Sequence, residues 1–344
     1  MKAARIDLRS DTVTIPTPEM KAAMTAAPLG DDVYGEDPSV NALQDMMATR
    51  FAMEAGLFVP TGVMSNQIGL KAWTQPGDEV IVEKESHIFN YETAAPSMMS
   101  AVQLHTVDSA LGVFAIDDVA RAVRPGEYYY PRTAVVCIEN THNRYGGTLY
   151  PVERMRELRS FCAERDIRLH LDGARIWNAH AATGTSFEDY GRAVDSISIC
   201  FSKGLGAPVG SMLLGPADFI ARAHRYRKIF GGGMRQAGML AAAAAYAVDA
   251  HLPLLAADHR RARRLAEGLR DIETFFVDLS RVQSNMVLLD FTQSAIRAAR
   301  AQELLAAQGL RIGMGMGDML RAVLHLDLDD DAVDRAIEIF HRVF

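Results

Sequence analysis

The stretch IRLHLDGAR at 167–175, followed by VDSISICFSKGLGAPVGS at 194–211, decides the fold of this chain. In both segments a run of apolar and β-branched residues stops at a charged one, Asp172 in the first and Lys203 in the second. Nearly continuous apolar runs of this length are typical of strands that are buried on both faces of a sheet. Glycines at 204, 206 and 210 surround Lys203 with very few side chains, a setting that a solvated lysine does not need.

Further strand-like runs flank these two, and helix-like stretches separate several of them. The clearest helix is 151–166, where Val152, Met155, Leu158 and Cys162 recur every three or four residues. Strands that alternate with such helices predict an α/β fold with a mostly parallel central sheet and helices on both faces. The other strands expected in this sheet lie at 79–83, 101–107, 133–140 and 210–215.

The sequence pattern changes near residue 234, where long helix-like stretches begin. Short strand-like runs follow at 285–291, 309–315 and 320–328, and a last helix ends the chain. We therefore predict three parts: an N-terminal segment at 1–45, a large domain at 46–245 and a small α+β domain at 246–344.

Composition narrows the class of protein. A net charge of −7 argues against a nucleic-acid partner, and we interpret the basic run at 259–264 as a solvated helix face. Three widely spaced cysteines, Cys137, Cys162 and Cys200, predict reduced thiols in a cytoplasmic protein. The first residues lack the apolar core of a secretory signal, and the alanine-rich run at 239–250 is too short to span a membrane.

Candidate functional residues follow from the predicted sheet. Ligands of open parallel sheets bind outside the carboxyl ends of the strands, so the residues just after each strand are the candidates. Taken singly, each has an ordinary structural interpretation, such as a helix cap, a solvated lysine or a partly buried histidine. Together they converge on one end of one sheet: Asp172, Arg175, Lys203, His87 and the turn at 61–66.

This set of residue types fits pyridoxal 5′-phosphate. The aldehyde of that cofactor forms a Schiff base with a lysine amine, here Lys203. Its ring nitrogen stays protonated when a buried carboxylate faces it, here Asp172. Its phosphate suits the helix N-terminus at Thr61 and Gly62, and its flat ring suits a stacking partner, here His87.

Motifs along most of the chain carry a family resemblance. They include RSDTVT (9–14), GDDVYGEDPSVNALQ (30–44), ESHIFNYE (85–92), ENTHNRYGGTLYP (139–151) and GGGMRQAG (231–238). The most specific are DGAR at 172–175 and, after it, SKGLGAPVGS at 202–211. From about residue 5 to 330 the chain resembles the low-specificity L-threonine aldolases, which are fold-type-I pyridoxal-phosphate lyases.

The resemblance implies a role for each matching residue. It implies that Lys203, His87 and Asp172 are catalytic. It implies further cofactor contacts from Arg175, Thr61, Gly62, Val63, Ser202 and Arg235, and substrate contacts from Ser10, Arg175, Arg321, Tyr34 and Tyr129. It also implies a homodimer or homotetramer with active sites at the dimer interface, to which the segment 1–45 contributes and where Tyr34 and Arg235 serve a neighbouring subunit.

The chain departs from the family pattern at two positions. Val63 stands where many relatives have a threonine, so one hydroxyl is missing from the phosphate turn and Thr61 is a candidate replacement. The stretch EYYYPRT at 127–133 stands where several relatives place a histidine, and Tyr129 is the expected equivalent near the β-hydroxyl of the substrate.

The expected reaction is cleavage of the Cα–Cβ bond of L-threonine or L-allo-threonine to glycine and an aldehyde. His87 and a bound water are both candidate bases for the β-hydroxyl proton. The alternatives on the same cofactor are phenylserine cleavage, β-elimination, racemisation and hydroxymethyl transfer. Outside this class remain a non-catalytic binding role, a nucleotide site at the Gly-rich stretches 231–234 or 313–318, and a metal hydrolase that uses His170 and Asp172. We expect no metal.

Overall fold

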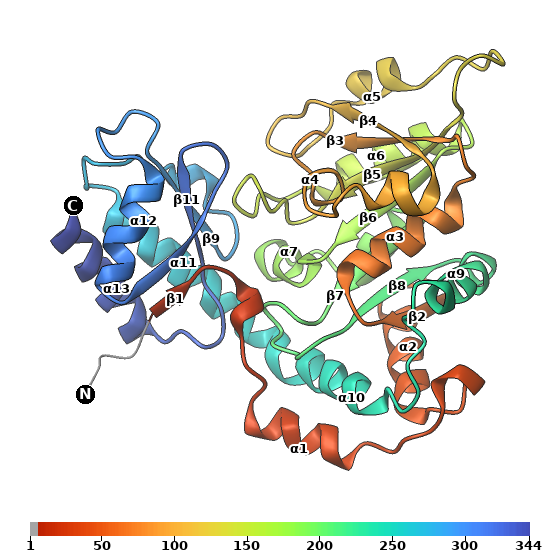
Figure 1. Cartoon of the computed structure of the whole chain (residues 1–344), viewed down its shortest axis with the longest axis horizontal. Helices are drawn as coiled ribbons and strands as arrows, with labels where there is room; N and C mark the ends of the chain where they lie inside the picture. The colour runs from red at the N-terminus through yellow and green to blue at the C-terminus, as the bar shows by residue number, and fades with distance from the viewer. Residues whose placement is uncertain (1–5) are drawn as a thin grey trace.

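The computed structural model describes residues 6–344, and Figure 1 shows a large α/β part beside a smaller α+β part. The strands of the large part are β2 (Ala55–Val59), β3 (Glu79–Glu83), β4 (Gln103–Val107), β5 (Thr133–Glu139), β6 (Arg168–Gly173), β7 (Ser196–Cys200) and β8 (Ser211–Gly215). They form one 7-stranded sheet in the order β2-β8-β7-β6-β5-β3-β4. Only β8 runs antiparallel to its neighbours β2 and β7, so the mostly parallel central sheet is confirmed.

Helices cover both faces of this sheet because its strands are apolar on both sides. On β5, Val136 and Ile138 face one hydrophobic cluster, whereas Val135 and Cys137 face another. The first cluster is covered by α2 (Pro38–Arg50), α5 (Ile116–Ala122), α6 (Val152–Ala163), α7 (Ile176–Thr183), α8 (Phe187–Arg192) and α10 (Gly238–Tyr246). The opposite face is covered by α3 (Gly62–Trp73) and α9 (Ala217–Ile229).

The small part has a sheet of its own. Its strands are β1 (Ile6–Leu8), β9 (Met286–Asp290), β10 (Leu310–Met314) and β11 (Met319–Val323), in the order β1-β10-β11-β9. The helices α11 (Leu255–Leu269), α12 (Ala298–Ala307) and α13 (Asp330–Val343) pack on it. β1 pairs in parallel with β10, Ile6 opposite Leu310, a pairing that the sequence did not predict.

The N-terminal segment then leaves the small part and crosses to the large one. It contains the short 3-10 helices η1 (Asp11–Val13) and η2 (Asp32–Tyr34) and the helix α1 (Pro18–Ala26), which packs against α10. In Figure 1 this segment is the red strand and chain that link the two parts. The N-terminal segment therefore contacts the small part through β1 and the large part through α1.

One helical stretch, Gly238–Leu269, contains an 18-residue window with a mean hydropathy of 1.4, which by length and composition is apolar enough to cross a membrane. It runs past the alanine-rich segment through π-helical η4 (Ala247–His251) and 3-10 helical η5 (Leu252–Leu254) into α11. Ala241, Ala243 and Ala244 of α10 are fully buried in the protein. Of the apolar window, 39% is buried, and the helical stretch passes from the large part to the small one.

Candidate active site

Lys203 lies in the loop that joins β7 to β8, at the carboxyl end of β7. Its carbonyl oxygen accepts a hydrogen bond from the N–H of Gly206 at 2.7 Å and one from the Thr14 hydroxyl at 3.2 Å. Gly206 has a φ of +77°, and a Cβ there would lie 2.8 Å from the Leu326 side chain. The glycine thus allows the tight turn that leaves the half-buried Lys203 side chain few neighbours.

Asp172 is the carboxylate at the end of the neighbouring strand β6 and is only 2% exposed. Its Oδ2 accepts from the Asn66 amide at 2.9 Å, and its Oδ1 accepts from the N–H of Ala174 at 3.0 Å. Within residues 6–344, no cationic side chain forms an ion pair with it. A buried carboxylate that receives only neutral donors matches a ligand that brings its own positive charge, such as a protonated pyridine nitrogen.

His87 begins the short helix α4 (His87–Asn90) just after β3. Its Nδ1 lies 3.0 Å from Oε1 of the buried Glu92. Because Glu92 also accepts from the amides of Asn66 and Gln67, we assign the proton to Nδ1 of His87, which leaves Nε2 as the acceptor. Burial lowers the pKa of His87, but the hydrogen bond to Glu92 and the charge of Asp172 outweigh it, so the pKa is raised.

His87, Glu92 and Asp172 are close enough together to hold a metal ion, with ligand atoms within 4.8 Å of one another. The two carboxylates, however, already accept hydrogen bonds from amide N–H groups of Asn66 and Gln67. Nδ1 of His87 faces Glu92 and carries the proton of that hydrogen bond, so this nitrogen is not free to bind a cation. The group is therefore better described as a hydrogen-bonded network than as a metal centre.

The phosphate turn lies at the N-terminus of α3. The Thr61 hydroxyl caps this helix by accepting from the N–H of Met64 at 3.1 Å, while the Val63 side chain is exposed. Beside the turn, a Cβ added to Gly62 would lie 3.7 Å from Oγ of Ser211. That buried hydroxyl has no hydrogen-bond partner in the described part of the chain, so it is a free donor where the cofactor phosphate is expected.

Two arginines meet at Asn143, Arg175 from the start of α7 in the large part and Arg321 from the small part. Arg175 makes a two-pronged ion pair with Asp11, at 2.8 and 2.7 Å, and Arg321 on β11 donates to Oδ1 of Asn143 at 2.7 Å. Burial would raise the pKa of Asp11, but the charge of Arg175 lowers it to about 2. Nε of Arg321 is buried and has no partner among residues 6–344, and burial together with the charge of Arg175 lowers the pKa of Arg321. A buried guanidinium with an unpaired Nε can donate a hydrogen bond to an anionic group.

Glu139, the last residue of β5, connects the two halves of the site. Its Oε2 accepts from the N–H of His87 at 2.7 Å, and its Oε1 accepts from the N–H of Asn143 at 2.8 Å. Sequence reasoning missed Glu139 as a site residue, together with Asp11, Asn66, Glu92, Asn143 and Ser211. All except Ser211 act by contacts between distant segments that spacing does not reveal. Five of the six lie inside motifs quoted above, and Asn66 lies in the turn at 61–66.

The other predicted site residues are distributed unevenly. Ser10 caps η1 next to Asp11, and Oγ of Ser202 lies 3.3 Å from the Cys200 sulfur at the end of β7. Tyr34 is 75% exposed, and Arg235 pairs with Asp31 at 3.3 Å on the surface. Within residues 6–344, neither side chain forms a hydrogen bond or ion pair with another predicted site residue, and their roles at a subunit interface stay predictions.

Within one chain, Tyr129 lies away from the other predicted site residues, and its substrate contact stays a prediction. Tyr129 is 65% exposed in the loop before β5, at the edge where the parallel strands begin. Figure 1 shows this loop at the far end of the sheet, away from the small part. A residue just before a strand lies at the opposite edge from residues just after it, so the subunit's own Tyr129 does not reach its Lys203.

Two of the alternative sites also lack the required geometry. The Gly-rich stretch 313–318 forms the hairpin between β10 and β11, and 231–234 joins α9 to α10, so neither links a strand to a helix as nucleotide motifs do. His170 is fully buried inside β6 with Nδ1 at 2.9 Å from the Ser196 hydroxyl, and burial lowers its pKa to about 4. It is a satisfied core histidine.

The comparisons with known proteins agree with this geometry. The family described as "Beta-eliminating lyase" matches residues 7–292. The chain belongs to the β-eliminating lyase family. Among the relatives of the chain, the low specificity L-threonine aldolase of Escherichia coli K12 is 42% identical over 324 residues, which are 94% of each protein. The low-specificity L-threonine aldolase 1 of Arabidopsis thaliana is 38% identical and covers 98% of this chain and 96% of its own length.

Solved structures share the fold. A threonine aldolase of Leishmania major superposes with a TM-score of 0.84 and 19% identity, over 98% of this chain and 99% of that one. An aspartate aminotransferase of Thermus thermophilus superposes with a TM-score of 0.75 and 19% identity, over 99% of this chain and 92% of that one. The chain therefore has the fold-type-I architecture of pyridoxal-phosphate enzymes, as the sequence predicted.

Proposed function

We propose that this protein is a pyridoxal-phosphate-dependent aldolase that cleaves L-threonine, L-allo-threonine and related β-hydroxy-α-amino acids to glycine and an aldehyde. The observation that carries the proposal is the buried Asp172 carboxylate, which has no cationic partner in the described chain and ends the strand next to that of Lys203. The full-length similarity to L-threonine aldolases supports the choice of reaction.

When bound, pyridoxal phosphate supplies an electrophilic aldehyde and an electron-accepting ring. Lys203 would be the amine for that aldehyde, Asp172 would keep the ring nitrogen protonated, and the N-terminus of α3 with Ser211 would hold the phosphate. Arg175, half-buried Ser202 and His87 would line the ring.

The remaining residues act on the substrate. Arg321 binds the α-carboxylate with its free Nε, and Asn143 fixes the direction of that guanidinium, with Ser10 close by. This orientation sets the Cα–Cβ bond for cleavage. His87 Nε2, or a water, accepts the β-hydroxyl proton as the aldehyde leaves, and the Cα of the product glycine then gains a proton.

Product analysis tests the reaction. Retro-aldol cleavage of threonine gives glycine and acetaldehyde in equal amounts, whereas β-elimination gives 2-oxobutanoate and ammonia. We expect acetaldehyde and glycine, and racemisation would give neither pair. Appearance of 2-oxobutanoate as the main product would overturn the aldolase assignment and keep the cofactor. The rate of aldehyde release from phenylserine, compared with that from threonine in the same assay, tests for a preference for bulky substrates.

Replacement of Arg321 tests carboxylate recognition. Arg321→Lys should lower kcat/KM for L-threonine about 10- to 100-fold, mainly through KM, because one charge-assisted hydrogen bond is lost. The matched control is Arg311→Lys on the neighbouring strand β10, where the arginine lies 3.9 Å from Asp7 at the surface. An unchanged KM in Arg321→Lys would remove Arg321 from the substrate site.

Replacement of Glu92 tests the orientation and basicity of His87. Glu92→Gln removes the charge that raises the pKa of His87, so that pKa should fall. If neutral His87 is the base, the acid limb of the kcat profile shifts to lower pH, and the maximum falls about tenfold. Glu85→Gln is the control, because Glu85 pairs instead with Arg144 at 2.8 Å. An unshifted acid limb in Glu92→Gln would assign the base to water.

We also propose a homodimer or homotetramer in the cytoplasm. The exposed Tyr34 and the surface pair of Arg235 with Asp31 support an interface close to the site. Three free, buried cysteines support a reducing compartment. Sedimentation analysis of the enzyme with cofactor bound measures the oligomer directly, and a monomer would contradict this proposal.

A further inference from the structure

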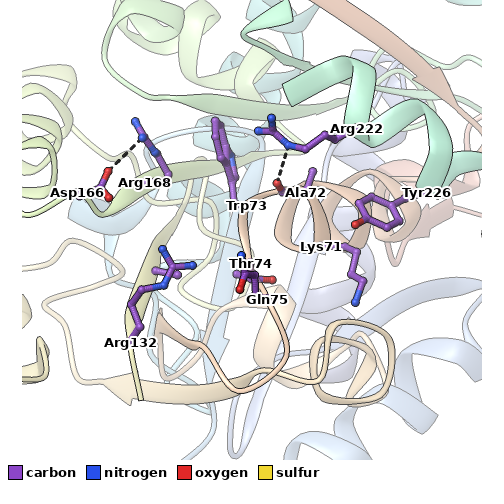
Figure 2. A pocket seen from close by; sticks show the side chains of 11 residues that line it. Lys71, Ala72, Trp73, Thr74, Gln75, Arg132, Asp166, Arg168, Arg222 and Tyr226 are labelled. Carbon is purple, nitrogen blue, oxygen red and sulfur yellow. Dashed lines mark hydrogen bonds and ion pairs between the residues drawn. The ribbon is translucent and has the colours of Figure 1, made fainter. Parts of the chain in front are cut away.

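A second pocket, of about 420 Å³, opens at the edge of the central sheet opposite to Lys203. Its walls come from the end of α3, the residues that begin β5 and β6, and α9. The residues that matter for its chemistry are Lys71, Trp73, Arg132, Asp166, Arg168 and Arg222 (Figure 2). The volume suits a small-molecule ligand, since such pockets usually measure about 300–1,000 Å³.

The pocket is positively charged in a chain whose net charge is −7. Four cationic side chains line it, and Asp166 is the one acidic residue of the lining. Asp78 and Asp218 pair with Arg132 and Arg222 from just outside, and the positive charges still outnumber the negative ones. An anion is therefore the ligand that this electrostatic environment favours.

Several of these cations have free hydrogen-bonding capacity. Lys71 forms no ion pair within residues 6–344. Arg168 pairs with Asp166 at 3.2 Å, but the Asp166 side chain is 82% exposed, and such surface pairs add little stability and exchange easily. Arg132 uses Nε and one terminal nitrogen on Asp78, at 3.0 and 2.6 Å, which leaves the other terminal nitrogen available.

Trp73 holds two of the guanidiniums in place. Their central carbons lie 5.4 Å (Arg168) and 5.7 Å (Arg222) from the Trp73 ring, and Figure 2 shows them on either side of it. The ring itself is fixed, because it stacks on Phe219 at 4.2 Å and its N–H donates to the Ser196 hydroxyl at 2.8 Å. Binding thus costs less side-chain entropy than binding to free surface arginines would.

We propose that this pocket binds a small anion with two or more negative charges, carried as phosphate or carboxylate groups. Planar guanidinium forks recognise both kinds of oxyanion with paired hydrogen bonds, and Lys71 adds a point charge. The site lies outside the aldolase chemistry, so the proposal is independent of the proposed function.

Calorimetric titration of the enzyme with cofactor bound, in phosphate-free buffer at 0.1 M sodium chloride, tests this site. Pyrophosphate and citrate are the probes, and acetate is the monovalent comparison. We expect one saturable site per chain with a Kd below about 1 mM for at least one multivalent probe, and no binding of acetate. Pyrophosphate alone would indicate a phosphate ligand, and citrate alone a polycarboxylate.

Variants locate the binding. Lys71→Gln with Arg168→Gln should weaken it at least about tenfold, and Asp166→Asn, which removes the acid of the lining, should tighten it about threefold. Arg121→Gln with Arg270→Gln is the matched control, because it removes two surface charges outside the pocket. The proposal fails if neither probe binds, if the control pair weakens binding equally, or if the Lys71 and Arg168 pair leaves it unchanged.

Discussion

Lys203→Ala should lower acetaldehyde release from L-threonine by at least about 10³-fold. The reason is chemical, because Lys203 is the amine positioned at the carboxyl edge of the sheet, one strand away from Asp172. The variant should fold normally, since no hydrogen bond or ion pair of the Lys203 ammonium group is recorded in the described chain.

Borohydride reduction followed by peptide mapping gives a readout that does not depend on turnover. The parent enzyme should carry the reduced cofactor on the peptide that contains Lys203, and Lys203→Ala should carry none. Lys84→Ala is the control, because Lys84 is an exposed residue that pairs with Asp108 at 3.1 Å. Full activity in Lys203→Ala, or an adduct on another lysine, would remove Lys203 from its role.

Asp172→Asn should retain the cofactor but lose at least about 10²-fold in kcat. The substitution keeps the size of the side chain and removes the charge that faces the ring nitrogen. The two oxygens of Asp172 now accept one hydrogen bond each, from Asn66 and from the N–H of Ala174. An asparagine has only one oxygen, so its NH2 group would face one of these two donors. We therefore expect a modest loss of stability, of about 1–3 kcal/mol, beside the loss of rate.

An Asp→Asn substitution at the opposite edge of the sheet separates the loss of rate from the loss of stability. Asp195→Asn alters a partly buried carboxylate that accepts from the N–H of Leu169 at 2.8 Å, remote from the carboxyl ends of the strands. It should lower the melting temperature without a comparable loss of kcat. The absorbance of the bound cofactor should change in Asp172→Asn and not in Asp195→Asn. Wild-type turnover in Asp172→Asn would contradict the role of this carboxylate as the partner of the ring nitrogen.

The sequence predicted the central sheet because its strands are buried on both faces and read as unbroken apolar runs. The rule that ligands bind at carboxyl ends then selected Lys203, Asp172 and His87, which all lie at that edge of the sheet. The same rule does not select Tyr129 in the loop before β5, because that assignment rests on resemblance alone.

Other features could not be obtained from local pattern. β1 is a strand of only three residues, which is too short to show an alternation of apolar and polar residues. It pairs with a strand some 300 residues later in the chain. The bridge through Glu139 and the ion pair of Asp11 with Arg175 likewise join segments far apart in sequence. Such contacts follow from the tertiary fold, and hydrophobic periodicity carries no information about them.

The most direct test of the central claim is the initial rate of acetaldehyde release from the four stereoisomers of threonine, with added pyridoxal phosphate. The account predicts release from L-threonine or L-allo-threonine, with equimolar glycine, and none from the two D-isomers. An enzyme that binds the cofactor and releases acetaldehyde from no stereoisomer would keep the fold and contradict the proposed reaction.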